Sequence, residues 1–165
     1  MIGQLGDLID PIQLAEKRGF FEDKLSIREL ERLSGLLMDD VGEAAFELLF
    51  SKQGKFTAIS GFVNANLAIK CQTCLEKLVF SVQSQIKLAV VSSIDEAKIL
   101  PESYEPLLLE GKGIAITDII EDEILLALPI VPKHNNCRPQ STSVQKFPEE
   151  NPFAILSQLK NQGDH

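Results

Sequence analysis

The centre of the chain alternates apolar and polar residues with a period of two, the pattern of half-buried antiparallel strands. The alternation runs through residues 42–52, 56–70 and 77–91, with short connections between them. Three such segments in succession predict a meander whose apolar positions turn toward one core. The positions expected to face that core are Phe46, Leu48, Phe50, Ile59, Val63, Leu67, Ile69, Phe80, Val82, Ile86 and Leu88.

Two helices are predicted before the meander. Asp10 precedes a proline, and an aspartate cap followed by proline at the first helical position is a strong helix start. Gly19 favours a stop, which gives a short helix over residues 11–18. A capping box at Ser26 opens an apolar repeat at helical spacing and predicts a second helix over about residues 27–37. The stripe expected to pack in the core is Ile27, Leu30, Leu33 and Leu37.

A third helix is predicted over residues 116–128, where isoleucines recur at helical spacing and Pro129 ends the run. We expect it to cover the meander. Glu121, Asp122 and Glu123 point in different directions around such a helix, which favours a solvated face interacting with the helix dipole; contact with a protein is the alternative. The predicted fold class is therefore α+β: an antiparallel β-meander packed by short helices, with a CxxC motif at a hairpin tip.

The rest of the chain contains few signals of regular structure. Residues 92–115 carry two prolines and two glycines and are predicted to be irregular. A chain of 165 residues supports one domain, which we place at residues 1–137 as a single globular unit. Residues 138–150 are polar and predict a flexible linker. Residues 151–165 predict a short C-terminal helix and tail.

Charge is distributed unevenly along the chain, whose net charge is −8. Residues 1–42 carry 9 acidic and 5 basic side chains, and residues 95–123 carry 9 acidic and 2 basic ones. Residues 43–94 carry 3 acidic and 5 basic side chains, a net +2. Because phosphate contacts dominate nucleic-acid affinity, so acidic a chain is a poor candidate for wrapping RNA. It suits a basic protein partner, or RNA contact through one local patch.

Such a patch has candidate residues in the meander. Lysines and phenylalanines there could form a modest basic strip that contacts phosphate or a stacked base. The alternative is that these residues simply lie on the solvent-exposed face of the sheet. The residues are Lys52, Lys55, Lys70, Lys87, Phe56 and Phe62.

Several function classes find no support in the sequence. No apolar run is long enough to cross a bilayer, and residues 1–10 lack the basic residue of a signal peptide. Three cysteines make no disulfide framework, which favours a reducing, cytoplasmic setting. There is no glycine-rich phosphate loop, GxSxG or HExxH motif, and the only histidines are His134 and His165. We therefore expect no enzyme, no membrane contact and no small-molecule substrate.

One group of residues suggests a specific chemistry, and it contains all three cysteines and one of the two histidines. The group is Cys71, Cys74, His134 and Cys137. Each pair has the same spacing, and two such pairs predict a four-ligand zinc site with ligand atoms within roughly 4 Å of one another. The open alternative is that both hairpin cysteines are ordinary small residues and His134 is a solvated loop residue. A redox CxxC is disfavoured, since it would sit at a helix N-terminus beside a βαβ unit.

Several segments together resemble the YceD family, the large ribosomal RNA subunit accumulation proteins. Their order and spacing match along nearly the whole chain, and EDEILLALPIVP and NPFAIL are the most specific pieces. The matching segments are residues 10–18, 71–74, 100–106, 120–132 and 151–156.

The resemblance implies a non-enzymatic, cytoplasmic factor needed for the synthesis, processing or stability of large-subunit (23S) ribosomal RNA. The implied partners are a large-subunit precursor, ribosomal RNA and/or a basic ribosomal protein, for which residues 95–123 would supply a complementary field. It also implies that Cys71 and Cys74 are the family's CxxC, whereas the stretch holding His134 and Cys137 varies within the family. The competing hypothesis is a zinc-stabilised protein-interaction module unrelated to the ribosome.

Overall fold

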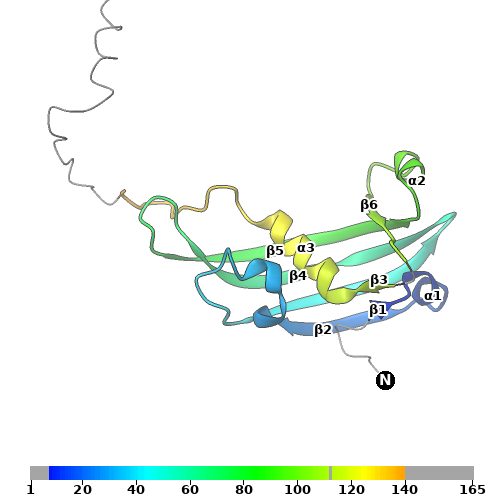
Figure 1. Cartoon of the computed structure of the whole chain (residues 1–165), viewed down its shortest axis with the longest axis horizontal. Coiled ribbons are helices and arrows are strands. Elements are labelled where there is room, and N and C mark those ends of the chain that lie inside the picture. The colour runs from blue at the N-terminus through cyan, green and yellow to red at the C-terminus, as the bar shows by residue number, and fades with distance from the viewer. Residues whose placement is uncertain (1–7, 112, 140–165) are drawn as a thin grey trace, which may run out of the picture.

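A five-stranded sheet organises the part of the chain that the computed structural model describes, residues 8–111 and 113–139. Neighbouring strands pair antiparallel, except that the last two run parallel. In spatial order the strands are β2 (Phe20–Ser26), β3 (Glu43–Gln53), β4 (Phe56–Lys70), β5 (Lys77–Val91) and β6 (Glu105–Leu108). Figure 1 shows helix α3 (Ile116–Ala127) lying across one face of this sheet.

Short elements complete the fold. They are β1 (Leu8–Ile9), α1 (Pro11–Glu16), the 3-10 turns η1 (Ile27–Glu29) and η2 (Glu31–Leu33), α2 (Ile94–Lys98) and β7 (Ile114–Ala115). β1 and β7 form a separate antiparallel pair. The predicted α+β class, with an antiparallel meander packed by short helices, is confirmed. Within the described residues, no helix is long and apolar enough to cross a membrane.

The N-terminal helix begins where the sequence places it and ends two residues earlier than predicted. The Asp10 side chain caps α1 by accepting hydrogen bonds from the backbone N–H groups of Ile12 at 2.9 Å and Gln13 at 3.1 Å. Arg18 then takes a left-handed conformation, with φ of 50°, and the N–H of Gly19 donates to the Leu14 carbonyl at 2.8 Å. The chain therefore leaves the helix before the predicted end and enters β2.

The predicted meander is present as β3, β4 and β5, with bounds within one residue of those predicted from the alternation. Gly54 lies in the turn between β3 and β4 with φ of +60°, a conformation that glycine adopts without steric cost. Gly61 is required for another reason, since a Cβ there would lie 1.9 Å from the carbonyl oxygen of Glu47. Only glycine allows β3 and β4 to approach this closely.

One face of the sheet and the inner side of α3 form the core. Every strand position predicted to face the core is buried, apart from Phe80, which is half-buried. α3 spans all but the last residue of the predicted helix and covers this face. The buried residues of its apolar stripe are Ile116, Ile119, Ile120 and Ile124.

The segment after β2 differs from the prediction. Residues 27–37 form two 3-10 turns instead of one α-helix, and Leu30 between them has non-helical backbone angles, φ −97° and ψ 80°. The predicted stripe is nevertheless buried at Ile27, Leu30 and Leu33. Leu37 forms an isolated β-bridge with β4. The apolar spacing therefore identified the buried residues but not the backbone conformation.

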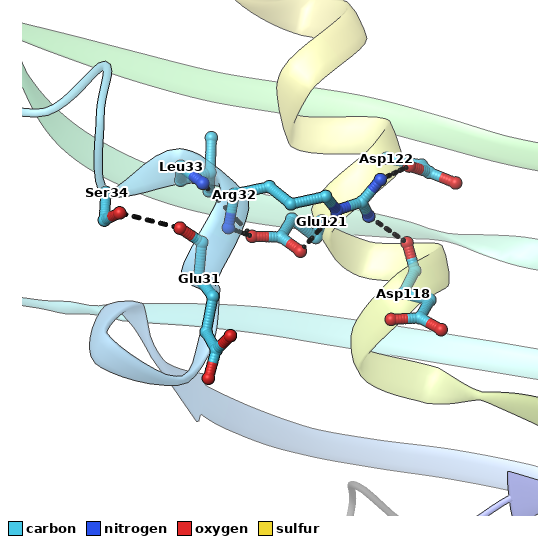
Figure 2. Close-up of polar contacts among 7 residues, drawn as sticks. All are labelled: Glu31, Arg32, Leu33, Ser34, Asp118, Glu121 and Asp122. Carbon is cyan, nitrogen blue, oxygen red and sulfur yellow. Dashed lines mark hydrogen bonds and ion pairs between the residues drawn. The ribbon is translucent and has the colours of Figure 1, made fainter.

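A carboxylate from α3 takes the place of the missing helical hydrogen bonds (Figure 2). Glu121 is 5% exposed and accepts from the backbone N–H groups of Arg32 at 2.7 Å and Leu33 at 3.2 Å. Its second oxygen accepts from Arg32 Nε at 2.8 Å, while Arg32 Nη1 donates to Asp122 at 2.6 Å. In a continuous helix, the two N–H groups would donate to carbonyls four residues earlier. The buried carboxylate accepts from Arg32 instead, and Leu33 shares its N–H between this carboxylate and the Leu30 carbonyl, both at 3.2 Å.

The acidic run on α3 is not the solvated face that the sequence predicted. Glu121 and Glu123 are buried, and only Asp122 between them is exposed. Glu123 accepts a hydrogen bond from the Ser84 hydroxyl of β5 at 3.0 Å. Burial raises the pKa of the Glu123 carboxyl; the Ser84 bond opposes this rise, and nearby carboxylates add to it. Two of the three acids thus face the protein interior because distant residues supply their partners.

Regular structure also occurs where the sequence predicted little. β2 is an edge strand whose charged run at residues 22–24 concealed any alternation. Residues 92–115, predicted to be irregular, contain α2, β6 and β7. The predicted helix over residues 151–165 and all but the first two residues of the linker at 138–150 lie outside the described residues.

Replacing Glu121 with alanine is predicted to lower the free energy of unfolding by about 3 kcal/mol, because two backbone N–H groups and a guanidinium lose their buried acceptor. Asp122→Ala is the matched control, since it removes an exposed partner of the same arginine and should cost less than about 1 kcal/mol. Urea unfolding of both variants measures the difference. Equal losses would contradict the structural role assigned to Glu121.

Candidate metal centre

The turn between β4 and β5 brings Cys71 and Cys74 together at the tip of a hairpin, as predicted. Six residues, 71–76, form this tip. The Leu75 N–H donates to the Cys71 carbonyl at 3.0 Å, and the Cys71 N–H donates to the Glu76 carbonyl at 2.9 Å. Leu75 adopts a left-handed conformation with φ of +62°, which lets the chain reverse within so few residues. The two side chains are thereby held on one compact turn.

The second pair of residues, His134 and Cys137, lies in the segment that follows α3. Pro129 ends the helix, and the following segment passes beside the hairpin tip, where Figure 1 shows the orange trace next to the green one. The backbone N–H of Gln72 donates to the Pro132 carbonyl at 2.8 Å, which joins the two loops directly. His134 and Cys137 follow this joint, so a gap of 60 residues between Cys74 and His134 is closed.

Four candidate ligand atoms, one from each residue, lie within 4.8 Å of one another. Cys71 Sγ is 3.6 Å from Cys137 Sγ, and Cys74 Sγ is 3.4 Å from His134 Nδ1. Cys71 is fully buried, Cys74 is 9% exposed, and the other two side chains are half-buried. The structure therefore brings together all four residues selected from the sequence, in a cluster slightly wider than the predicted ~4 Å.

The donors and their outer contacts suit a zinc ion. Tetrahedral zinc, with bonds of ~2.3 Å to sulfur and ~2.1 Å to nitrogen, sets ligand atoms about 3.5–3.8 Å apart. The two short separations in the cluster are close to this value. His134 turns Nδ1 to the cluster, while its Nε2 lies 3.2 Å from the Lys77 carbonyl. An Nε2–H that donates to this carbonyl leaves Nδ1 free of a proton, as metal ligation requires.

The tip also favours a negative charge on one sulfur. Burial is the largest single influence on the Cys71 thiol and raises its pKa. Backbone N–H groups of the tip and of His134, with a smaller contribution from the Cys74 side chain, lower that pKa to about 5. A backbone hydrogen bond at Glu76 lowers the pKa of Cys74, yet burial and the neighbouring thiols outweigh it, so the pKa is raised. A thiolate therefore forms readily on Cys71 and is disfavoured on Cys74, where a bound cation would offset the repulsion between the sulfurs.

The lysines predicted to form one basic strip are dispersed, since Lys70 lies at the hairpin tip and Lys87 pairs with Ser60 toward the opposite end of β4. Lys52 and Lys55 border the turn between β3 and β4, where Phe56 packs edge-on against Tyr104 with ring centroids 5.2 Å apart. The remaining members are exposed on the two long strands: Lys70, Lys87 and Phe62. Of the two histidines, His165 lies outside the described residues.

Main-chain groups are the part of the site that sequence reasoning missed. The carbonyl of Lys77 orients the His134 ring, and the carbonyl of Pro132 fixes the second loop against the first. The Thr73 N–H donates to Cys71 Sγ at 3.4 Å. Such groups are present at every residue, so no side-chain signal could have identified them.

Comparisons with known proteins agree on one family. The sequence model described as "Large ribosomal RNA subunit accumulation protein YceD" matches residues 59–160, a range that includes all four candidate ligands. A protein of Haemophilus influenzae with the same description is 31% identical over 163 residues, which cover 92% of this chain and 94% of the relative. No solved structure matches the chain.

The pKa of Cys71 predicts the behaviour of the metal-free protein. Thiolate ultraviolet absorbance, followed during a pH titration after chelation, should show one thiol ionising at a pKa of about 5, below the ~8.5 of a free cysteine. Cys71→Ser should abolish this early step. Cys74→Ser should retain it, because the backbone N–H groups at Cys71 remain. A first ionisation near the ordinary cysteine range would refute the electrostatics described for the tip.

Proposed function

Because this chain belongs to the YceD family of large ribosomal RNA subunit accumulation proteins, we propose that it is a non-enzymatic ribosome-biogenesis factor. It is needed for the synthesis, processing or stability of 23S ribosomal RNA. The observation that carries this proposal is the similarity to a relative so described, along almost the whole length of both chains. The factor works in the cytoplasm, by binding and without a small-molecule substrate.

Its partner is a large-subunit precursor, engaged through ribosomal RNA, a basic ribosomal protein or both. The charge distribution supports this choice. Seven of the nine acidic residues within 95–123 are exposed and create a field that complements a basic protein, while Glu121 and Glu123 are buried. The net +2 of residues 43–94 suits a polyanion. The two kinds of contact therefore use different parts of one surface.

We further propose that Cys71, Cys74, His134 and Cys137 hold a zinc ion. The support is the donor set, the two short separations and the carbonyl that orients His134. When bound, zinc supplies structural cross-linking and no catalytic chemistry, since four protein ligands leave no open position. The cross-link stabilises the joint between the hairpin tip and the loop after α3, because metal binding and local folding share one free energy.

A zinc-stabilised interaction module without any link to the ribosome is the second candidate. The strongly acidic net charge of −8 favours it, since an RNA-associated protein is more often basic. Both candidates contain the same metal centre. They differ in whether the protein accompanies ribosomal particles, which can be measured.

Purified protein is predicted to contain one zinc ion per chain. The double variant Cys71→Ser with Cys74→Ser should contain almost none, because it removes half of the ligand set. Asn136→Ala is the control, as it alters the same exposed loop without removing a ligand, and it should retain the metal. Elemental analysis gives the metal content. Near-zero zinc in both the parent protein and the control would dismiss the metal site.

Deleting the gene is predicted to lower large-subunit ribosomal RNA relative to small-subunit RNA, most clearly under cold stress. The parent protein should also sediment with large-subunit precursors in a sucrose gradient. RNA quantification and immunoblotting of the gradient fractions measure the two effects. An unchanged RNA ratio, with the protein remaining at the top of the gradient, would favour the interaction module instead.

A further inference from the structure

The sheet has a second face, turned away from α3, on which β4 and β5 expose mainly polar side chains, apart from Phe62 and Val79. Three successive cross-strand pairs expose their side chains there: Phe62 with Gln85, Asn64 with Gln83, and Asn66 with Ser81. Lys87 continues the same row toward the far end, and Lys70 and Lys77 close it at the hairpin tip. We call these nine residues the amide face.

The amide face combines an aromatic ring with hydrogen-bonding side chains. Phe62 is 41% exposed, an unusual position for a phenylalanine at the centre of a sheet. Of the four side-chain amides in the row, that of Gln85 lies opposite Phe62 and the other three lie beyond it. Each amide can donate and accept hydrogen bonds in one plane. The Ser81 hydroxyl donates to Asn66 Oδ1 at 2.6 Å, which orients that amide. Aromatic rings flanked by such groups suit unpaired bases, which offer a flat surface and polar edges.

The charges on this side of the sheet are separated by strand. From residue 56 to residue 91 the chain contains one acidic residue, Glu76, against Lys70, Lys77 and Lys87. On the neighbouring strands, Glu22 and Glu47 stand opposite each other. Acidic residues therefore border the amide face on the β2 and β3 side, next to Phe62, while β5 carries lysines and no acid. This pattern complements a polyanion whose backbone follows β5.

We propose that the amide face binds single-stranded RNA, with one base stacked on Phe62, base edges hydrogen-bonded to the amides, and phosphates near Lys70 and Lys87. This inference rests on the proposed function and identifies where the ribosomal RNA is touched. Glu47 lies directly across from Phe62 on β3 and repels phosphate, which restricts the RNA backbone to the β5 side. The row from Phe62 to Lys70 spans about 27 Å, enough for several nucleotides.

A duplex would not fit the same chemistry. Its bases are stacked on one another and their pairing edges are occupied, so neither Phe62 nor the amides would gain a partner. A basic protein would bind through acidic side chains, and none of the nine residues of the amide face is acidic. The surface therefore favours unpaired RNA over both of these occupants.

Fluorescence anisotropy with the full-length protein and a labelled single-stranded RNA of about 12 nucleotides tests this surface. The parent protein should bind this RNA more tightly than a duplex of the same length. Phe62→Leu should weaken binding about tenfold, the loss expected for one stacked base. Phe20→Leu is the matched control, because Phe20 is an exposed phenylalanine on β2, outside the amide face. The RNA affinity of this variant should change less than about twofold.

Charge reversal tests the phosphate contacts independently. Lys70→Glu with Lys87→Glu should weaken binding and reduce the slope of log affinity against log salt by about 1.4. Lys17→Glu with Lys55→Glu makes the same change in net charge outside the amide face and should leave the slope nearly unchanged. Lys77 is left intact because it pairs with Asp39 at 2.6 Å. Thermal unfolding of every variant confirms that the fold persists.

Three results would overturn the RNA surface. They are no binding of single-stranded RNA at low salt, equal losses in the variants and their controls, and capture of a basic ribosomal protein in place of RNA. Expression in a deletion strain separates this failure from that of the proposed function. If Phe62→Leu restores large-subunit RNA as fully as the parent chain, the surface is wrong and the function stands. If the parent chain itself has no effect on that RNA, the function fails.

Discussion

The buried carboxylate of Glu121 determines how the two segments that cover the sheet are placed against each other. It accepts hydrogen bonds from the backbone of residues 32 and 33 and from the Arg32 guanidinium, so one side chain of α3 organises a loop 88 to 89 residues earlier. Such a group is costly to bury unless each acceptor is used. Here the loop forms 3-10 turns instead of a regular helix, so its N–H groups can donate to Glu121. The loop and α3 are thereby fixed over the same apolar face of the sheet.

The position of α3 in turn decides whether the candidate metal centre can form. The helix ends at Ala127, seven residues before His134 and ten before Cys137. Within that short stretch His134 and Cys137 must reach the tip of the longest hairpin in the sheet. They do so because α3 ends along the course of β5, and because Gln72 holds the Pro132 carbonyl at the tip. The ligand cluster is thus a consequence of helix placement.

The long hairpin of β4 and β5 contributes to three regions of the molecule at once. Alternate side chains of one parity fill the core, those of the other parity form the amide face, and the connecting turn carries two cysteines. A period-two backbone makes this division possible, since neighbouring residues point to opposite sides. Packing on one face leaves the other face to expose polar side chains, of which Asn66 is held by Ser81. The core and the proposed RNA contact therefore use opposite faces of the same strands.

The sequence by itself determined the elements whose signals are local. Alternation located the three meander strands within one residue, an aspartate before a proline located the start of α1, and cysteine spacing selected the ligand cluster. Tertiary structure decided the rest. Residues 27–37 have helical periodicity, yet Glu121 accepts hydrogen bonds from two backbone N–H groups that would donate to carbonyls within a helix. The burial of Glu123 and the Lys77 carbonyl behind His134 likewise depend on partners distant in sequence. Local patterns cannot encode such partners, because a hydrogen bond depends on which groups meet in space.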